Sequence, residues 1–147
     1  MKITAIYGTN HTGSTVLLAR MLMQSLPQDN TTFSEFFLPR DFSHVCSGCC
    51  ACFESSEPLC QLASAQLEPI LQAIDASDVI LLASPVYAYH VTGAMKSFLD
   101  HLGNRWIVHR PNGKLTRKTA VLLATAAGSG LRQTVRDMKD SVNWWGV

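Results

Sequence analysis

The stretch ITAIYGTNHTGST, residues 3–15, decides the fold and indicates the chemistry. Residues 3–7 form an apolar, β-branched run typical of a buried strand, and residues 16–23 have the composition of a helix. The loop between them is rich in glycines and hydroxyls, and its N–H groups and the positive end of the helix dipole converge on one point. No lysine follows the second glycine and the three-glycine dinucleotide fingerprint is missing, which excludes two common nucleotide-binding loops. We therefore predict that this loop binds the phosphate of a mononucleotide-like cofactor.

The composition predicts one packed domain over residues 1–147. Apolar residues make up 47% of the chain, enough to bury a core and too much for a disordered protein. A net charge of +1 with 16% charged residues leaves no basic face for nucleic acid. We expect no membrane span, because no run of 18 apolar residues is present, and no export signal. The expected location is the cytoplasm.

Apolar strands and amphipathic helices alternate along the chain. Strands are predicted at residues 3–7, 31–38, 78–83 and 119–124, and helices at residues 13–26, 65–76, 93–102 and 131–144. Ser14 or Thr12 is the expected cap of the first helix, whose apolar residues at 17, 18, 21, 22 and 26 form one stripe. Pro69 is expected in the first turn of its helix. The alternation predicts a three-layer, doubly wound α/β fold with a parallel sheet.

Three predicted strands end in loops of small and polar residues, at residues 8–15, 84–91 and 125–130. The carboxyl ends of parallel strands meet at one edge of a sheet, where such folds bind their ligands. We therefore expect one site built from these three loops. A sheet of this type normally has a fifth strand, so either a partner subunit covers the edge or the chain is a shortened version of the fold.

Five cysteines lie between Cys46 and Cys60, in a long connection over residues 40–65. The thiols of Cys46, Cys49 and Cys52, at i, i+3 and i+6, can reach three corners of a [4Fe–4S] cubane, with Cys60 as the fourth ligand. Zinc would more naturally use two separated Cys-x-x-Cys pairs. Two alternatives stay open: the thiols carry no cluster, or they form a redox disulfide. Cys50 is left over.

Two motifs resemble the flavodoxin-like NAD(P)H-dependent FMN reductases. Residues 8–15 resemble the family's FMN-phosphate loop, and residues 84–87 with 92–100 are very similar to its second flavin loop and the helix that follows. The cysteine segment resembles the motif of the iron–sulfur flavoproteins, a branch of that family. The resemblance implies strand order 2-1-3-4, bound FMN, NAD(P)H as electron donor and a homodimer or homotetramer.

Carried over position by position, the resemblance assigns the site residues. The phosphate would be held by Thr9, Asn10, His11, Gly13, Ser14 and Thr15, and the ring lined by Pro85, Val86, Tyr87 and Ala88, with Thr125 to Gly130, including Gly128, approaching from the third strand. Asn10-His11 stands where Pro-Arg is common in the family. Tyr87 or Tyr89 either stacks on the ring or caps the core, and Arg105, Arg110 and Lys114 either attract a nicotinamide phosphate or lie in a solvated loop.

The predicted function is an FMN-dependent oxidoreductase that passes electrons from NAD(P)H or a reduced carrier to a flavin, a quinone or a similar acceptor, either a small molecule or a redox protein. No catalytic side chain is assigned, because the flavin carries the chemistry. The first alternative is a non-enzymatic, flavodoxin-like electron carrier with an iron–sulfur cluster. The second is a redox-sensing or interaction domain that has lost its cofactor.

Overall fold

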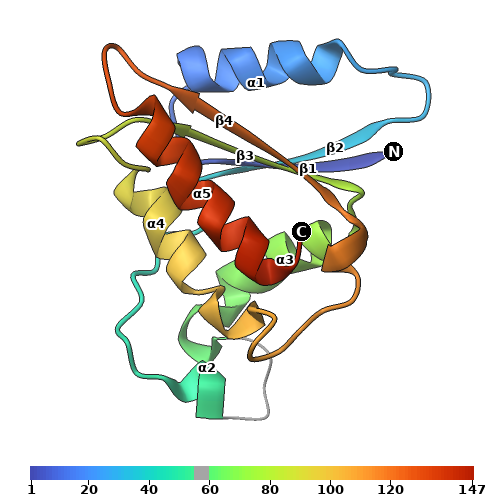
Figure 1. Cartoon of the computed structure of the whole chain (residues 1–147). Coiled ribbons are helices and arrows are strands. Elements are labelled where there is room, and N and C mark those ends of the chain that lie inside the picture. Colours follow the sequence, from blue (N-terminus) through green and yellow to red (C-terminus); the bar gives the residue numbers. More distant parts are fainter. Residues whose placement is uncertain (55–59) are drawn as a thin grey trace.

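A computed structural model describes residues 1–54 and 60–147 and contains a parallel sheet between two helical layers (Figure 1). The strands are β1 (Lys2–Tyr7), β2 (Thr32–Phe37), β3 (Val79–Pro85) and β4 (Thr119–Thr125). The helices are α1 (Ser14–Gln24), α2 (Ala51–Glu54), α3 (Ser64–Ala76), α4 (Gly93–Asp100) and α5 (Leu131–Trp145). The described strands pair in the order β2-β1-β3-β4, all parallel, so the predicted fold and strand order are confirmed.

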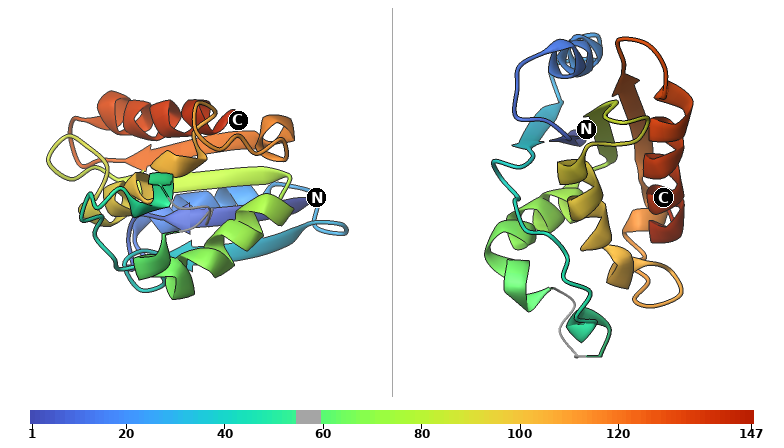
Figure 2. Two further views of the ribbon diagram at one scale, coloured as in Figure 1. Left: turned by 90° about the horizontal axis from the view of Figure 1, so that it is seen from below. Right: turned by 90° about the vertical axis from the view of Figure 1, so that its left-hand side faces the viewer.

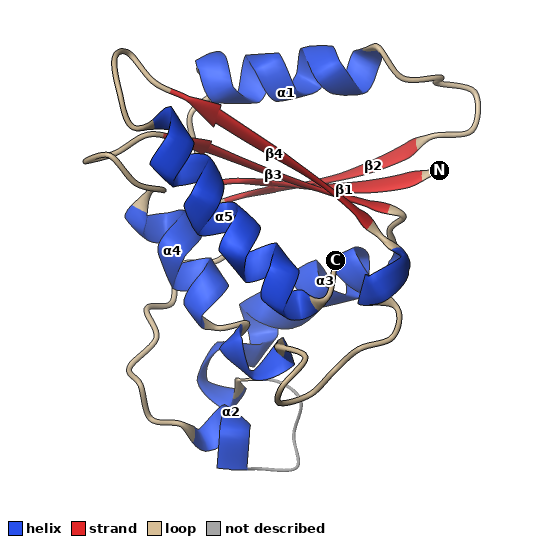
Figure 3. Ribbon diagram, in the orientation of Figure 1, coloured by secondary structure: helices blue, strands red, loops and turns tan. Residues whose placement is uncertain are grey.

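Alternate residues of the central strands face two separate apolar clusters. Ile6 and Leu82 pack with residues of α3, α4 and α5, whereas Tyr7 and Leu81 pack with residues of α1. Figures 2 and 3 show α1 on one face of the sheet and α3, α4 and α5 on the other. The strands are buried on both faces near the middle of the sheet, as continuous apolar runs predict.

The predicted apolar stripe of α1 does not face the sheet. Its buried residues are Thr15, Val16, Ala19 and Met23, whereas Leu17, Leu18, Met21 and Leu22 are exposed. Small side chains let α1 lie close to the sheet, and the helical stripe of larger aliphatic residues points to solvent. Among the described helices, α1 is the one that covers this face (Figure 1).

Several element ends differ from the predictions, most clearly in α1, β3 and α3. Helix α1 ends at Gln24, two residues before the predicted end, and its N-cap is Gly13, without a side-chain cap from any described residue. Strand β3 continues through Ser84 and Pro85, which were predicted as loop. Pro69 lies inside α3, beyond the first turn, because this helix begins at Ser64.

The long connection after β2 contains α2 and a 3₁₀ turn at Gln61–Ala63, and residues 55–59 lie outside the described chain. Further 3₁₀ turns occur at Gly103–Arg105 and Leu115–Arg117. Within the described residues, no helix combines the length and the apolar character needed to cross a membrane.

Candidate functional site

The three loops at the carboxyl ends of β1, β3 and β4 enclose one cavity of about 360 Å³. Figure 1 shows these loops gathered at the ends of the strand arrows. The cavity is lined by Thr9, His11, Gly13, Ser14, Thr15, Pro85, Val86, Tyr87, Thr125, Ala126 and Ala127. Nine of the twelve predicted cofactor-binding residues are therefore brought together. Asn10, Ala88 and Gly128 do not line the cavity, and cofactor binding by all twelve stays a prediction.

One end of the cavity has the donor chemistry of a phosphate site. Helix α1 begins at Ser14, and no described side chain caps it, so the N–H groups of its first turn point to the cavity without a side-chain acceptor. Thr9 and Ser14, which carry hydroxyls, line the same cavity. Thr15 is buried, and its hydroxyl lies 2.5 Å from that of Thr125, which ties the first loop to the third. This set fits the phosphate of FMN.

A group of hydrogen bonds around Gly8 joins the first loop to the second. The Gly8 N–H donates to the Ala83 carbonyl at 2.7 Å, and the Thr92 hydroxyl donates to the Gly8 carbonyl at 2.7 Å. The Thr92 N–H in turn donates to the Ser84 hydroxyl at 3.2 Å. A Cβ on Gly8 would lie 2.9 Å from the hydroxyl oxygens of Ser84 and Thr92. A residue larger than glycine would therefore displace these two side chains. Thr92 also accepts from the Met95 N–H as N-cap of α4.

The second loop lines the cavity with Pro85, Val86 and Tyr87. The Val86 N–H donates to the Thr125 carbonyl at 2.8 Å, which ties this wall to the third loop. Tyr87 and Tyr89 are 57% and 65% exposed, so the interpretation as core residues is wrong for both. Pro85, Val86 and Tyr87 present flat or apolar surfaces to the cavity, which suits one side of an isoalloxazine ring.

Sequence reasoning missed Asp137 of α5. Its carboxylate accepts from the His90 ring and from the Val91 N–H, three and four residues after the cavity-lining Tyr87. No local motif contains Asp137, because its partners are 46 and 47 residues away in the chain. Its spacing from the buried Thr134 and Met138 places it at the edge of the buried face of α5, a weak signal at most.

The cysteines gather at a second place, away from this cavity. Cys46, Cys49, Cys50, Cys52 and Cys60 line a pocket of about 150 Å³ with His44 and His101, and this pocket shares no lining residue with the cavity. Burial raises the pKa of the Cys52 thiol, and the thiols of Cys60, Cys46 and Cys49 raise it further.

Across residues 1–54 and 60–147, no group of three Cys, His, Asp or Glu residues is arranged to hold a metal ion. The described residues therefore do not fit the [4Fe–4S] cluster, and Cys46, Cys49, Cys52 and Cys60 stay ligands by sequence prediction alone.

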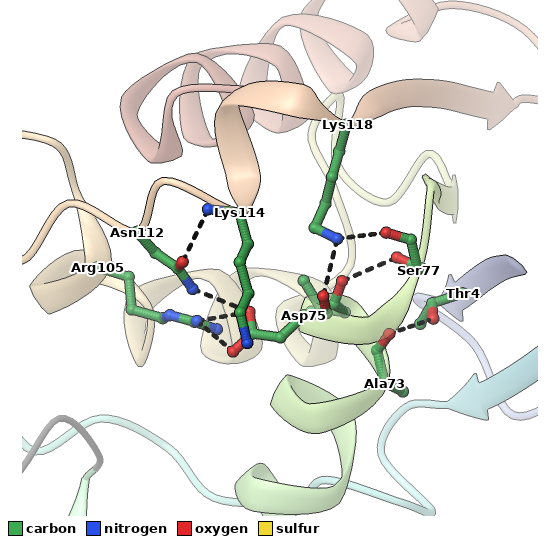
Figure 4. A network of polar contacts seen from close by, with 9 residues as sticks. Thr4, Ala73, Asp75, Ser77, Arg105, Asn112, Lys114 and Lys118 are labelled. Atoms are coloured by element: carbon green, nitrogen blue, oxygen red, sulfur yellow. Dashed lines mark hydrogen bonds and ion pairs between the residues drawn. The ribbon is translucent and has the colours of Figure 1, made fainter.

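Figure 4 shows Arg105, Lys114 and Lys118, from the loop before β4, around Asp75 at the end of α3. The Arg105 guanidinium binds the Asp75 carboxylate at 2.7 and 2.9 Å, and Asn112 donates to the same carboxylate at 3.2 Å. The Lys118 ammonium donates to the carbonyls of Asp75 and Ser77, at the end of α3. Arg105 is thus engaged in packing this loop against α3, and a role toward a nicotinamide phosphate stays a prediction.

Two curated relatives match parts of the chain. An iron-sulfur flavoprotein of Archaeoglobus fulgidus is 31% identical over 105 residues, which are 71% of this chain and 44% of that protein. An FMN-dependent NADH:quinone oxidoreductase of Yersinia enterocolitica is 28% identical over 76 residues, 48% of this chain and 38% of that protein. The chain thus spans less than half the length of these curated relatives.

The fold has close counterparts among solved structures. An azoreductase from Bacillus anthracis superimposes with a TM-score of 0.76 at 14% identity, over 99% of this chain and 82% of the other. The family model of the NADPH-dependent FMN reductases matches residues 1–147. On the strength of that match, the chain belongs to the NADPH-dependent FMN reductase family.

Proposed function

We propose that the chain binds FMN in the cavity of the three loops and acts as an NAD(P)H oxidoreductase. The observation that carries the proposal is the cavity itself, which has an uncapped helix N-terminus at one end and flat, apolar residues at the other. The family to which the chain belongs supports the same cofactor and the same electron donor. The acceptor is proposed to be a flavin, a quinone or a similar small molecule, since one relative is named for its quinone substrate.

Each part of the chain has a task in this proposal. The first turn of α1 and the hydroxyls of Thr9 and Ser14 bind the phosphate, and His11 replaces the arginine common in the family. Pro85, Val86 and Tyr87 orient the ring and exclude water from one side. FMN, when bound, supplies hydride and electron transfer, so the side chains need to position it and tune its electrostatics rather than move protons.

The proposal does not include an iron–sulfur cluster. The cysteine pocket holds no metal-binding group among the described residues, and it is separate from the cavity. All five cysteines are free thiols, which suits the reducing conditions of the cytoplasm, the location we propose. The non-enzymatic carrier with a cluster is the less supported of the two functions.

Steady-state kinetics distinguish the enzyme from the carrier. Purified protein with FMN is mixed with NADH or NADPH and a soluble quinone, and the loss of absorbance of the nicotinamide is followed. The enzyme oxidises the nicotinamide at a rate proportional to protein concentration, and heat-denatured protein with the same FMN is the control. No turnover above that control, together with reduction of the bound FMN by a reduced ferredoxin, would favour the carrier.

We also propose that the chain self-associates through the exposed stripe of α1, defined by Leu17, Leu18, Met21 and Leu22. Leu17 is 62% and Met21 57% exposed, and Val121 and Leu123 of β4 lie partly exposed on the same face of the sheet. The one charged residue of α1, Arg20, is paired with Glu35, so two such faces can meet without like-charge repulsion. A second copy of the chain is therefore the proposed occupant, in a dimer or tetramer.

A further inference from the structure

We infer that Asp137 of α5 is a positioning residue that fixes the ring-facing wall of the cavity. The inference rests on the proposed function, because it assigns Asp137 a role toward the flavin ring. The segment it holds is the tyrosine turn, defined as Tyr87–His90, which directly follows the cavity-lining residues Pro85 and Val86.

The tyrosine turn has a conformation that its residues do not favour on their own. Ala88 and Tyr89 have φ angles of 48° and 70°, in the left-handed region that glycine normally occupies. The turn is closed by two reciprocal hydrogen bonds, from the Tyr87 N–H to the His90 carbonyl at 3.0 Å and from the His90 N–H to the Tyr87 carbonyl at 3.1 Å. Strain of this kind persists when the surroundings impose it, so the contacts around the turn decide its shape.

Helix α5 contacts the end of the turn through the carboxylate of Asp137. Asp137 Oδ2 lies 2.9 Å from His90 Nδ1 and accepts the Val91 N–H at 3.3 Å, so it holds the exit of the turn through a side chain and through the backbone. Gln133, one turn earlier on α5, donates to Asp137 Oδ1 at 2.8 Å and thereby orients the carboxylate. Burial acts to raise the pKa of Asp137, but the hydrogen bonds from Gln133, His90 and Val91 outweigh it and keep the pKa lowered.

Gly130, the residue before α5, also packs against the turn. Gly130 has a φ of 96°, and a Cβ on it would lie 2.6 Å from Val86 Cγ1 and 2.9 Å from the Tyr89 Cα. The backbone of the third loop therefore packs directly against the turn. Gly130, just before α5, and Asp137, in the second turn of α5, therefore form a clamp on the tyrosine turn.

The clamp does not depend on a charged histidine. A neutral His90 that carries its proton on Nδ1 donates to Asp137 as a charged one does. The other charged groups that line the groove between α4 and α5 are Lys96, Asp100 and Asp140. Lys96 is paired with Asp100, and Arg136 lies 3.9 Å from Asp140, which leaves Asp137 as the partner of the His90 ring in this groove.

Hydrogen exchange of the flavin-free protein tests the clamp. Asp137→Ala should speed exchange at the Val91 amide, which loses its acceptor, and also at the Tyr87 and His90 amides by about tenfold, because the turn opens. A merely local loss would not move those two amides, since their acceptors are backbone carbonyls within the turn. Asp140→Ala, on the same helix and lining the same groove, should leave all three unchanged. Asp137→Asn, which keeps an acceptor oxygen, should restore most of the protection.

Flavin titrations then test the consequence for the site. Asp137→Ala should weaken the binding of FMN and of riboflavin by the same factor, about tenfold, because both flavins have the same ring. If the Tyr87 and His90 amides of Asp137→Ala exchange as slowly as in the wild type, Asp137 does not hold the turn, whether or not the protein binds flavin. Faster exchange with unaltered flavin affinities would overturn the positioning role. Wild-type protein that binds neither flavin would refute the proposed function, and the role of Asp137 toward the ring with it.

Discussion

At the scale of single residues, Gly8 is where the first two loops meet. A Cβ there would lie 2.9 Å from the Ser84 and Thr92 hydroxyl oxygens and 3.0 Å from the Met95 Cβ. We predict that Gly8→Ala lowers the free energy of unfolding by about 1–3 kcal/mol, the usual cost of overpacking. Gly93→Ala is the matched control, because its Cβ would meet no described atom within 4 Å. Urea unfolding of both variants is the measurement, and equal losses would contradict the packing role of Gly8.

Glu35 makes stability depend on pH. It accepts hydrogen bonds from the Tyr7 hydroxyl at 2.6 Å and from Arg20 Nε at 3.0 Å. Burial acts to raise the pKa of Glu35, but the hydrogen bonds from Arg20 and Tyr7 outweigh it, and the net pKa lies below its ordinary 4.5. A lowered pKa contributes stability that is present above pH 4.5 and is lost as the pH falls through the folded-state value.

Glu35→Gln should therefore cost roughly 1–3 kcal/mol of unfolding free energy at pH 7, and less in acid. Urea unfolding of the wild type and of Glu35→Gln from pH 7 to pH 3 measures the gap, which is the difference between their unfolding free energies at each pH. A gap that stays constant or widens as the pH falls would refute this explanation.

Among residues, those in local motifs were predictable and those fixed by distant contacts were not. Thr9, Gly13 and Ser14 follow from one strand, one loop and one helix start, and they line the cavity as expected. Asp137 has no such motif, because its role depends on how α5 lies beside a turn 46 residues earlier. Asn10 was predicted from its place in the loop, but its side chain position depends on how that loop bends, and it does not line the cavity.

At the scale of elements, the first turn of α1 is the proposed phosphate site. Ser14 is its first residue, and Gly13 before it is extended, a conformation that tolerates a following proline. Ser14→Pro removes one N–H with little cost to the helix, whereas Ser14→Ala removes the hydroxyl and keeps that N–H. We predict that Ser14→Pro weakens FMN binding by about tenfold or more, because the loss of one charge-assisted hydrogen bond to the phosphate has an effect of that size.

Isothermal titration with FMN and with riboflavin provides the measurement. Riboflavin, which lacks the phosphate, should bind all three proteins equally. A loss of riboflavin affinity in the proline variant that matches its loss of FMN affinity would rule out a specific contact with phosphate.

Element boundaries and faces were the part of the fold that the sequence pattern left open. The stripe of α1 has helical spacing, but spacing does not tell which side meets the sheet, and here the smaller residues do. Pro69 was placed at a helix start by its usual preference, yet α3 begins at Ser64, just after a 3₁₀ turn. In both cases tertiary packing overrides a local preference.

At the scale of the whole molecule, the topology was predictable because strands and helices alternate, and right-handed crossovers leave few arrangements. The assembly is the open feature, and the α1 stripe makes it testable. We predict that the wild-type chain sediments as a dimer or larger species and that Met21→Glu shifts it to the monomer. Val108→Glu, at another exposed apolar residue, is the control and should not change the sedimentation. A monomeric wild type at micromolar concentration would refute self-association through α1.

The central claim is that three loops form one FMN site with its phosphate end at α1. A fluorescence titration of FMN with purified, flavin-free protein tests it most directly, with riboflavin titrated in parallel. We expect saturable quenching with one FMN per chain, and binding of riboflavin at least about tenfold weaker because the phosphate contacts are missing. Unchanged FMN fluorescence, or equal affinity for the two flavins, would contradict it.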